Sequence, residues 1–197
     1  KISFPAEFHA QTAVEAAVQL HPEVARRIDE IDRIELTTHE SAIRIISKEG
    51  ALNNPADRDH CLQYMVAIGL LKGDLTAEDY EDQVAADPRV DQLRGLMRVQ
   101  EDPRYSAEYH DPERRSIANA VQVFFRDGTS TDRIEVEYPI GHRRRRQEGI
   151  PVLEAKFERN LRGHFPAVQS RRILDMFADA DRLRRIAVPD FVDAMVI

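Results

Sequence analysis

One predicted helix carries an imidazole and a phenol that could transfer protons. Within residues 57–72, Asp57, His60 and Tyr64 follow one another at intervals of three and four residues, which places them on one stripe of a helix. A histidine and a tyrosine one turn apart, at the edge of a buried face, could donate protons to an anionic substrate. The alternative is structural: Asp57 caps the helix and the Tyr64 ring belongs to the core. Spacing alone favours this structural interpretation.

The same helix carries Cys61, the only cysteine of the chain. A single cysteine permits no internal disulfide and no cysteine-based metal site, and it fits a reducing, cytosolic setting. Cys61 continues an apolar face with Leu62, Met65 and Val66, so we expect its side chain only to pack. The glycine at position 73 is expected to end the helix.

Four consecutive arginines, residues 143–146, follow Gly141 and His142 in a predicted loop spanning residues 139–149. Guanidinium groups match carboxylates and phosphates with two parallel hydrogen bonds, so this run could bind an anion. A solvated, charged loop is the commoner meaning of such a run. A second polar and aromatic stretch, residues 105–115, is also predicted as a loop, and its spacing indicates no particular reaction.

The remaining composition excludes several classes of protein. The formal net charge is -7, which argues against a general nucleic-acid binder, and no apolar run approaches the roughly 20 residues that span a bilayer. The seven histidines show no close ligand spacing, and the sequence has no glycine-rich phosphate loop or zinc-binding helix motif. We therefore expect no metal site. Because the chain begins at Lys1 and no signal peptide follows, we also expect it to be part of a longer protein.

The elements that must position these side chains alternate between helical and extended patterns. Residues 7–20 form a predicted helix that His21 and Pro22 interrupt, and a short charged helical stretch reaches residue 31. Alternation of Ile34 and Leu36 with charged residues predicts a half-buried strand over residues 33–38. Helices are then predicted over residues 40–48, 57–72, 76–84 and 89–97.

The second half of the chain gives the clearest hairpin pattern. Residues 117–125 are rich in β-branched and aromatic side chains, residues 126–129 form a turn, and residues 134–138 alternate again. Helical periodicity returns over residues 152–161 and 168–177. This order predicts an α+β fold in which helices cover a small antiparallel-type sheet, followed by C-terminal helices.

Several sequence blocks together resemble the MmgE/PrpD family, and in particular its dehydratase branch. These blocks are KISFPAEFHAQT at residues 1–12, TTHESA at 37–42, NNPADRDH at 53–60, HDPE at 110–113, SIANA at 116–120, YPIGHRRRR at 138–146 and EAKF at 154–157. The resemblance implies that residues 1–150 form the α+β lid domain of that fold. It implies that residues 151–197 are closing helices, which pack on a large N-terminal helical domain that this sequence lacks.

The resemblance also implies a reaction. It is a hydro-lyase reaction in propionate catabolism, the loss of water from 2-methylcitrate to give 2-methyl-cis-aconitate, and similar enzymes often act on citrate as well. No iron–sulfur cluster or other cofactor is implied, which agrees with the single cysteine. Two alternatives remain open: a noncatalytic domain that binds small anions, and a decarboxylase or isomerase of the same family.

Two positions, Lys1 and Tyr64, match active-site positions of the family, and four further candidates lie in the blocks quoted above. Lys1 would hold a substrate carboxylate and Tyr64 would donate a hydrogen bond or relay a proton, so these two are the expected catalytic residues. Arg58 and His60, in one block, and His142 and Arg144, in another, are the expected substrate-binding residues. The resemblance places the catalytic base in the N-terminal half of the family fold. It implies a tricarboxylate substrate and a cytoplasmic enzyme, is compatible with a homodimer, and implies no nucleic acid, membrane or metal.

Overall fold

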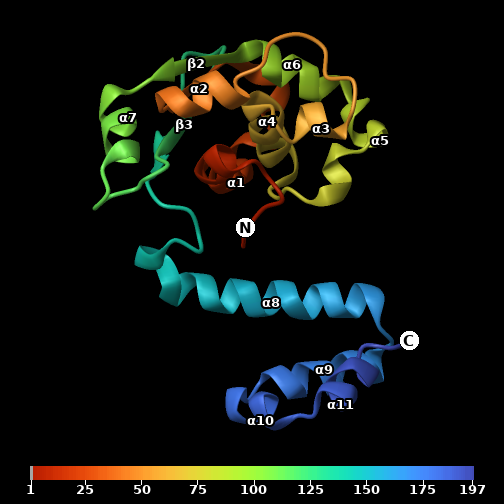
Figure 1. The fold of residues 1–197 in the computed structure, drawn as a ribbon. Coiled ribbons are helices and arrows are strands. Elements are labelled where there is room, and N and C mark those ends of the chain that lie inside the picture. Colours follow the sequence, from red (N-terminus) through yellow and green to blue (C-terminus); the bar gives the residue numbers. More distant parts are fainter. Residues whose placement is uncertain (1) are drawn as a thin grey trace. The chain divides into compact units, whose positions relative to one another are not determined.

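The structure, a computed structural model, describes residues 2–197 and divides them into two compact units, residues 3–146 and residues 147–197 (Figure 1). The first unit contains a four-stranded sheet with strand order β2-β1-β3-β4. Its strands are β1 (Ile31–Thr38), β2 (Met97–Glu101), β3 (Asn119–Phe125) and β4 (Ile134–Val136). The α+β class predicted from the sequence is therefore confirmed.

Strand pairing in the sheet is mixed. β1 pairs antiparallel with β3, and β3 pairs antiparallel with β4 through the predicted hairpin. β1 also pairs in parallel with β2, with Ile34 opposite Met97. The expected small antiparallel-type sheet did not include β2, and the helix predicted over residues 89–97 extended into the first residue of this strand.

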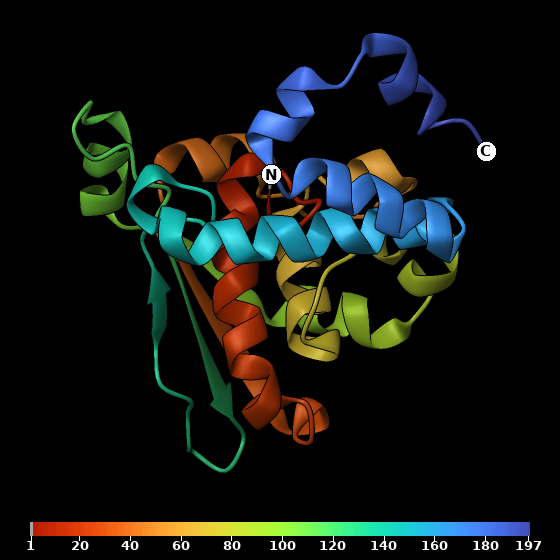
Figure 2. The same cartoon turned by 90° about the horizontal axis from the view of Figure 1, so that it is seen from below.

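The described part of the first unit also contains seven α-helices. They are α1 (Gln11–Val24), α2 (Glu40–Ile46), α3 (Pro55–Arg58), α4 (Leu62–Lys72), α5 (Asp82–Ala85), α6 (Pro88–Leu96) and α7 (Pro103–His110). Of these, α1 packs on β3 and β4. Short 3₁₀ helices add η1 (Phe8–Ala10), η2 (Ile28–Glu30), η3 (Ala77–Tyr80) and η4 (Arg143–Arg145). Figure 2 shows α1 between the sheet and α4, both of which it contacts.

The close contact of α1 with α4 depends on small side chains. Ala13, Ala16 and Ala17 of α1 are fully buried, and α4 presents Gly69 to this helix. A Cβ atom on Gly69 would lie 2.9 Å from the Cβ atom of Ala17, closer than carbon atoms approach without a shift. The absence of a side chain at position 69 therefore allows the two helix backbones to approach each other.

Helix α1 continues through the predicted interruption and ends at Val24. Pro22 cannot donate the helical hydrogen bond to the fourth residue before it, but this loss falls in the last turn, where little of the helix remains to be disturbed. The neighbouring His21 is fixed by its ring, because Nδ1 donates to the Leu70 carbonyl of α4 at 2.9 Å. The residue before a proline normally avoids the helical conformation, and here the contact of His21 with α4 outweighs that preference.

Two further predictions were wrong. The helix expected over residues 57–72 consists of α3 and α4 with a break between them, and the loop expected over residues 105–115 contains most of α7. Helix α7 begins at Pro103, and the side chain of Asp102 accepts a hydrogen bond from the Arg104 amide at 2.8 Å. This Asp-Pro pair is a helix-start signal, the same one that begins α6 at Asp87 and Pro88.

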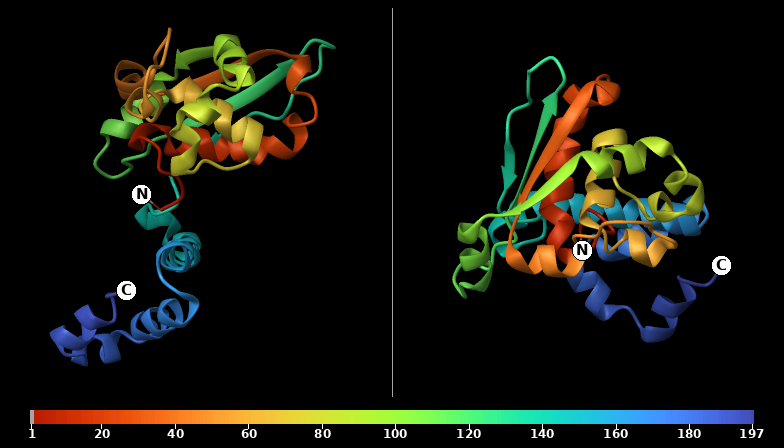
Figure 3. Two further views of the ribbon diagram at one scale, coloured as in Figure 1. Left: turned by 90° about the vertical axis from the view of Figure 1, so that its right-hand side faces the viewer. Right: turned by 90° about the horizontal axis from the view of Figure 1, so that it is seen from above.

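The hairpin is tied to the end of α1 by charged side chains. Figure 3 shows the turn between β3 and β4 at the same end of the unit as the C-terminal end of α1. Arg27, just after α1, donates to the Asp127 carboxylate of the turn at 2.8 Å, and its guanidinium lies 3.8 Å from the centre of the Phe125 ring. The arginine therefore fixes the hairpin to the helical layer from the outside.

The second unit consists of helices. α8 (Arg146–His164) begins at the last residue of the first unit and is followed by α9 (Ala167–Phe177), α10 (Ala180–Arg185) and α11 (Val188–Asp193). The two helices predicted in this region correspond to parts of α8 and α9. The rings of Phe157 and Phe177 meet edge to face with centres 5.0 Å apart, and Phe177 also contacts Phe191. Leu161 and Ile173 are buried beside them.

Candidate functional site

The stripe expected to join Asp57, His60 and Tyr64 does not exist, because the helix is broken between Arg58 and Leu62. The Asn54 side chain accepts a hydrogen bond from the Asp57 amide at 2.9 Å, which caps α3. Cys61 then adopts an extended conformation, with φ −119° and ψ 108°, before α4 begins. The buried position expected for Cys61 is confirmed, since it has no exposed surface.

Tyr64 lies in the core of the first unit. Its side chain is 2% exposed, and its hydroxyl donates to the Asp79 carbonyl at 2.5 Å. Its ring stacks on that of Tyr80, with centres 6.1 Å apart. Burial raises the pKa of the Tyr64 phenol to about 12, so the hydroxyl keeps its proton at neutral pH. Tyr64 therefore has the core position that the structural interpretation expected.

Arg58 meets the same turn as Tyr64. It is 5% exposed, and its guanidinium donates to the Tyr80 carbonyl at 2.6 Å and pairs with the Asp82 carboxylate at 2.7 Å. The structure therefore brings Arg58 and Tyr64 to one segment, residues 79–82. His60 does not join them: its ring is exposed, and Nδ1 lies 2.5 Å from the carboxylate of its neighbour Asp59.

The turn that receives both side chains is rigidly hydrogen-bonded. The Thr76 amide and hydroxyl donate to the Asp79 carboxylate at 2.8 and 2.9 Å, which forms a capping box, and Lys72 forms an ion pair with the same carboxylate. Burial acts to raise the pKa of Asp79, but the hydrogen bonds from Lys72 and Thr76 hold it below its usual value. Asp79 is therefore a fixed negative charge beside the Tyr64 hydroxyl.

His142 and Arg144 lie in a different part of the first unit, in and beside η4. The His142 ring stacks on Tyr138 with centres 4.5 Å apart, and its Nδ1 accepts from the Arg144 amide at 3.2 Å. The Arg144 guanidinium donates to the Glu113 carbonyl at 2.9 Å and lies over the Tyr138 ring. Burial and the neighbouring arginines lower the pKa of His142, so its ring is neutral at neutral pH.

The arginine run is partly structural. Arg145 forms two hydrogen bonds with the Glu15 carboxylate of α1, at 2.8 and 2.9 Å, and donates to the Tyr138 carbonyl at 2.7 Å. The loop expected over residues 139–149 is therefore fastened to α1. It contains the 3₁₀ helix η4, and the prediction was wrong for residues 146–149, which belong to α8. Of the remaining expected site residues, Lys1 lies outside the residues that the structure describes.

A second group of titratable side chains was missed by the sequence analysis. His9, on η1, places Nδ1 at 3.0 and 3.1 Å from the two carboxylate oxygens of Glu7, and its Nε2 lies 3.1 Å from the Tyr109 hydroxyl of α7. His39, between β1 and α2, stacks on the Tyr109 ring with centres 4.7 Å apart and lies 5.2 Å from the His9 ring. We call Glu7, His9, His39 and Tyr109 the imidazole–phenol cluster.

Charge in this cluster is set by the single carboxylate. Burial acts to raise the pKa of Glu7, but the hydrogen bonds from His9 hold it below its usual value, so Glu7 is ionised. Burial, with a contribution from His9, lowers the pKa of His39 to about 4, so this ring is neutral at neutral pH. The cluster therefore pairs one negative carboxylate with the nearer imidazole, His9, and leaves the second imidazole uncharged.

Two signals in the sequence could have located this cluster. Glu7 and His9 lie in the first block used for the resemblance, and His39 lies in the second. Tyr109 belongs to the segment interpreted as a loop. Recognition that Asp102 and Pro103 begin a helix would have placed Tyr109 on a rigid element, although only the folded chain shows that it meets His9, 100 residues away.

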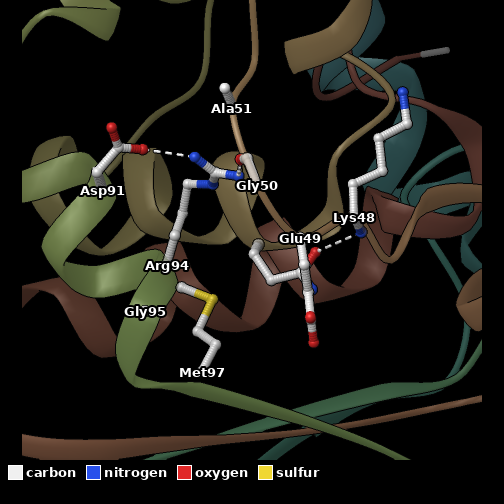
Figure 4. A pocket seen from close by; sticks show the side chains of 9 residues that line it. Lys48, Glu49, Gly50, Ala51, Asp91, Arg94, Gly95 and Met97 are labelled. Carbon is white, nitrogen blue, oxygen red and sulfur yellow. Dashed lines mark hydrogen bonds and ion pairs between the residues drawn. The ribbon is translucent and has the colours of Figure 1, made fainter.

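A pocket of about 400 Å³ lies elsewhere on the first unit, and Figure 4 shows the side chains around it. Its charged lining residues are Lys48, Glu49, Asp91 and Arg94. Arg94 is already paired with Asp91 at 2.5 Å and donates to the Gly50 carbonyl at 2.8 Å. Two cations and two anions leave no net charge to select a tricarboxylate, and none of the expected site residues lines this pocket.

Among residues 2–197, no group of three or more His, Cys, Asp or Glu side chains is arranged to hold a metal ion. The same residues include no helix that is long and apolar enough to cross a membrane.

Comparisons with known proteins agree with this architecture. Over 100% of its length, the chain is 55% identical to the 2-methylcitrate dehydratase of Escherichia coli strain K12 and 56% identical to that of Cupriavidus necator. It is 53% identical to the mitochondrial 2-methylcitrate dehydratase of Yarrowia lipolytica. The chain spans only 41% of the two bacterial enzymes and 38% of the yeast one.

The family assignment rests on a separate match. The sequence profile of the MmgE/PrpD C-terminal domain matches residues 4–182, which include nearly all of the first unit and the larger part of the second. The resemblance inferred from the sequence blocks is therefore confirmed, and the chain belongs to the MmgE/PrpD family, of which it represents the C-terminal domain.

Proposed function

We propose that this chain is the C-terminal part of a 2-methylcitrate dehydratase, a hydro-lyase that converts 2-methylcitrate to 2-methyl-cis-aconitate in propionate catabolism. The observation that carries the proposal is the level of identity, 53–56% along the whole chain, to bacterial and yeast enzymes that all bear this name. Citrate, which differs from 2-methylcitrate by one methyl group, is proposed as a second substrate.

The reaction sets the chemistry that the protein must supply. A dehydratase removes a weakly acidic proton from a carbon next to a carboxylate, and it protonates the departing hydroxyl group. It must also stabilise the negative charge that develops on that carboxylate. Three substrate carboxylates require local cations, although the chain carries a formal charge of -7.

We propose two basic groups for the carboxylates. Lys1 and Arg58 would hold one end of the substrate, and His142 with Arg144 would hold the other. In support, within the described part of the chain the Arg144 guanidinium donates to a backbone carbonyl, that of Glu113, and a carboxylate is the stronger acceptor. His60 is exposed and could contact a substrate from the surface of the unit.

Tyr64 would act through its hydroxyl. The single hydrogen of this hydroxyl is given to the Asp79 carbonyl, so donation to a substrate requires the exchange of that bond. In the longer protein, we expect Tyr64→Phe to lower kcat by about tenfold to a thousandfold if the exchange occurs, by analogy with other oxyanion donors.

The rest of the enzyme is proposed to lie in a helical domain that precedes this chain. Residues 1–150 would form the lid over the substrate, and residues 151–197 would pack on the helical domain. Exposed apolar side chains on the second unit, including Val168, Val188 and Phe177, support such a contact. The catalytic base is assigned to the same domain, and the enzyme is proposed to be cytoplasmic.

The test compares the longer protein with the isolated chain. Turnover of 2-methylcitrate is followed by absorbance of the conjugated product in the ultraviolet. We expect the longer protein to turn over 2-methylcitrate and the isolated chain to be inactive, because the base is assigned outside it. Appreciable turnover by the isolated chain would contradict the assignment of the base, and absence of turnover by the longer protein would contradict the function.

A further inference from the structure

Unpaired polar atoms gather at one end of the sheet. Thr38 Oγ1, His39 Nε2, Ser116 Oγ and Asn119 Oδ1 are buried and have no hydrogen-bond partner among the described residues. The pairing of Thr37 with Ala120 places Thr38 opposite Asn119, so these residues lie where β1 ends and β3 begins. An unpaired buried polar group destabilises the fold, so such groups in native proteins call for an explanation such as a catalytic role or a bound polar group.

The imidazole–phenol cluster lies at the same end of the sheet. His39 belongs to both groups, and the Asn119 amide donates to the His9 carbonyl at 2.9 Å. Three members of the cluster form a linear series of hydrogen bonds, from Glu7 through His9 to Tyr109. Because a carboxylate can only accept, His9 Nδ1 must donate to Glu7, which leaves Nε2 to face the Tyr109 hydroxyl.

The middle of this hydrogen-bonded series is buried and both of its ends are partly buried. His9 is 7% exposed, whereas Glu7 and Tyr109 are half-buried. Because Glu7 accepts from Nδ1, the Tyr109 phenol is the member through which Nε2 can exchange a proton with a group outside the cluster. A hydrogen-bonded carboxylate, imidazole and hydroxyl in this order is the arrangement by which proteins orient a base and activate a hydroxyl.

The surroundings fix the orientation of the His9 ring. Both oxygens of Glu7 face Nδ1, so the Nδ1–H group is held by the carboxylate and Nε2 faces the Tyr109 hydroxyl. The other titratable groups that face this ring are His39, which accepts from the Ala42 amide through Nδ1 at 3.4 Å, and Tyr109. His110, the next residue of α7, contacts the Tyr109 ring edge to face. Glu7 is the only carboxylate in this group.

We propose that Tyr109 is the general acid that protonates the departing hydroxyl, and that Glu7 and His9 are the positioning residues that resupply its proton. The proposal rests on the dehydratase function proposed above. The Tyr109 proton passes to the substrate hydroxyl oxygen, which leaves as water with the electron pair of the broken C–O bond. The Nε2 proton of His9 passes to the Tyr109 oxygen, and His9 ends neutral, with Nδ1–H still bonded to Glu7.

The first test measures kcat and the pH profile of kcat/KM in the longer protein. We expect Tyr109→Phe to lower kcat at least a hundredfold, within the range found for general acids. Tyr105→Phe is the matched control, because it removes a phenol hydroxyl from the same helix, one that bonds to Arg133 instead. We expect the control to stay within threefold of wild type. Equal kcat values in the two variants would overturn the proposal.

The pH profile separates proton supply from a merely structural role. Resupply needs a proton on Nε2 of His9, so we expect kcat/KM to fall on the alkaline side of the profile. Glu7→Gln removes the carboxylate that faces Nδ1, so we expect this alkaline limb to move to lower pH, whereas Tyr105→Phe should leave the limb in place. An unmoved limb in a folded Glu7→Gln protein would contradict the role of Glu7 and His9.

A second measurement does not depend on the reaction. Nitrogen-15 NMR of the 197-residue chain reports which nitrogen of His9 carries the proton in the neutral ring. We expect this proton on Nδ1, because both oxygens of Glu7 face that nitrogen and a carboxylate can only accept. A proton on Nε2 of the neutral ring would refute the cluster geometry. Failure of the longer protein to dehydrate 2-methylcitrate, with the NMR result as expected, would refute only the function.

Discussion

The hydroxyl groups of Tyr64 and Tyr80 offer a direct test of the packing around η3. Both rings are buried in the same layer and stack on each other. The Tyr64 hydroxyl donates to the Asp79 carbonyl at 2.5 Å, whereas the Tyr80 hydroxyl is buried without a partner among the described residues. The same substitution, Tyr to Phe, should therefore have opposite consequences at the two positions.

The magnitude follows from the hydrogen bond alone, because the ring of each tyrosine remains. Tyr64→Phe removes a buried bond and leaves the Asp79 carbonyl without it, which should lower the free energy of unfolding by about 1–2 kcal/mol. For a unit of this size, that loss lowers Tm by about 3–6 °C. Tyr80→Phe removes an unpaired buried hydroxyl, so stability should stay the same or rise by about 1 kcal/mol.

The assay is denaturant unfolding of the 197-residue chain and its two variants, with Tm measured in parallel. The denaturant dependence should be equal in all three proteins, because the buried area hardly changes. If Tyr64→Phe is no less stable than Tyr80→Phe, the hydrogen bond assigned to Tyr64 does not stabilise the fold, and the reasoning is refuted.

Three other predictions concern the core and the buried histidine. Gly69→Ala should lower the free energy of unfolding by about 1–2 kcal/mol, because the added Cβ would meet Ala17. The control Gly95→Ala, whose Cβ meets nothing within 4 Å, should raise it by up to about 1 kcal/mol, and equal effects in thermal melts would contradict the close approach of α1 and α4. Cys61→Ala should cost about 1 kcal/mol of stability through a small cavity and leave kcat of the longer protein unchanged; a large loss of kcat would show that the thiol does more than pack. Burial lowers the pKa of His39 to about 4, whereas a histidine in the unfolded chain titrates at about pH 6.5. The stability that the neutral His39 ring contributes is therefore present above about pH 6.5 and is lost as the pH falls toward 4. His39→Asn keeps a helix-capping side chain without a titrating one, so unfolding at pH 7 and pH 4.5 should show a smaller loss in this variant, and an equal loss would be contrary to expectation.

The sequence predicted those parts of the fold that local pattern determines. Alternation of apolar and polar residues located β1 and the β3–β4 hairpin, and glycine at position 73, with φ +70°, ends α4 as expected. β2 was missed because it is a five-residue strand at the edge of the sheet, mostly exposed, and its position depends on its parallel pairing with β1. The pattern of apolar and polar residues within a segment does not show which distant strand the segment pairs with.

The candidate site shows the same limit. Tyr64 was correctly placed on a helix, but its relation to His60 was wrong, because an extended residue at Cys61 shifts the helical phase. The bond between His9 and Tyr109 joins residues 100 positions apart, so it follows from the tertiary fold and from no spacing in the sequence. Resemblance identified the relevant blocks, and the structure showed which of their side chains meet.

The central claim, that this chain is part of a 2-methylcitrate dehydratase, is tested most directly by product analysis of the longer protein. The purified protein is incubated separately with 2-methylcitrate, citrate and cis-aconitate, and the products are identified by chromatography and mass. We expect loss of one water molecule from 2-methylcitrate to give 2-methyl-cis-aconitate, at a higher kcat/KM than for citrate. Release of carbon dioxide from cis-aconitate, with no dehydration of 2-methylcitrate, would contradict the claim and identify a decarboxylase.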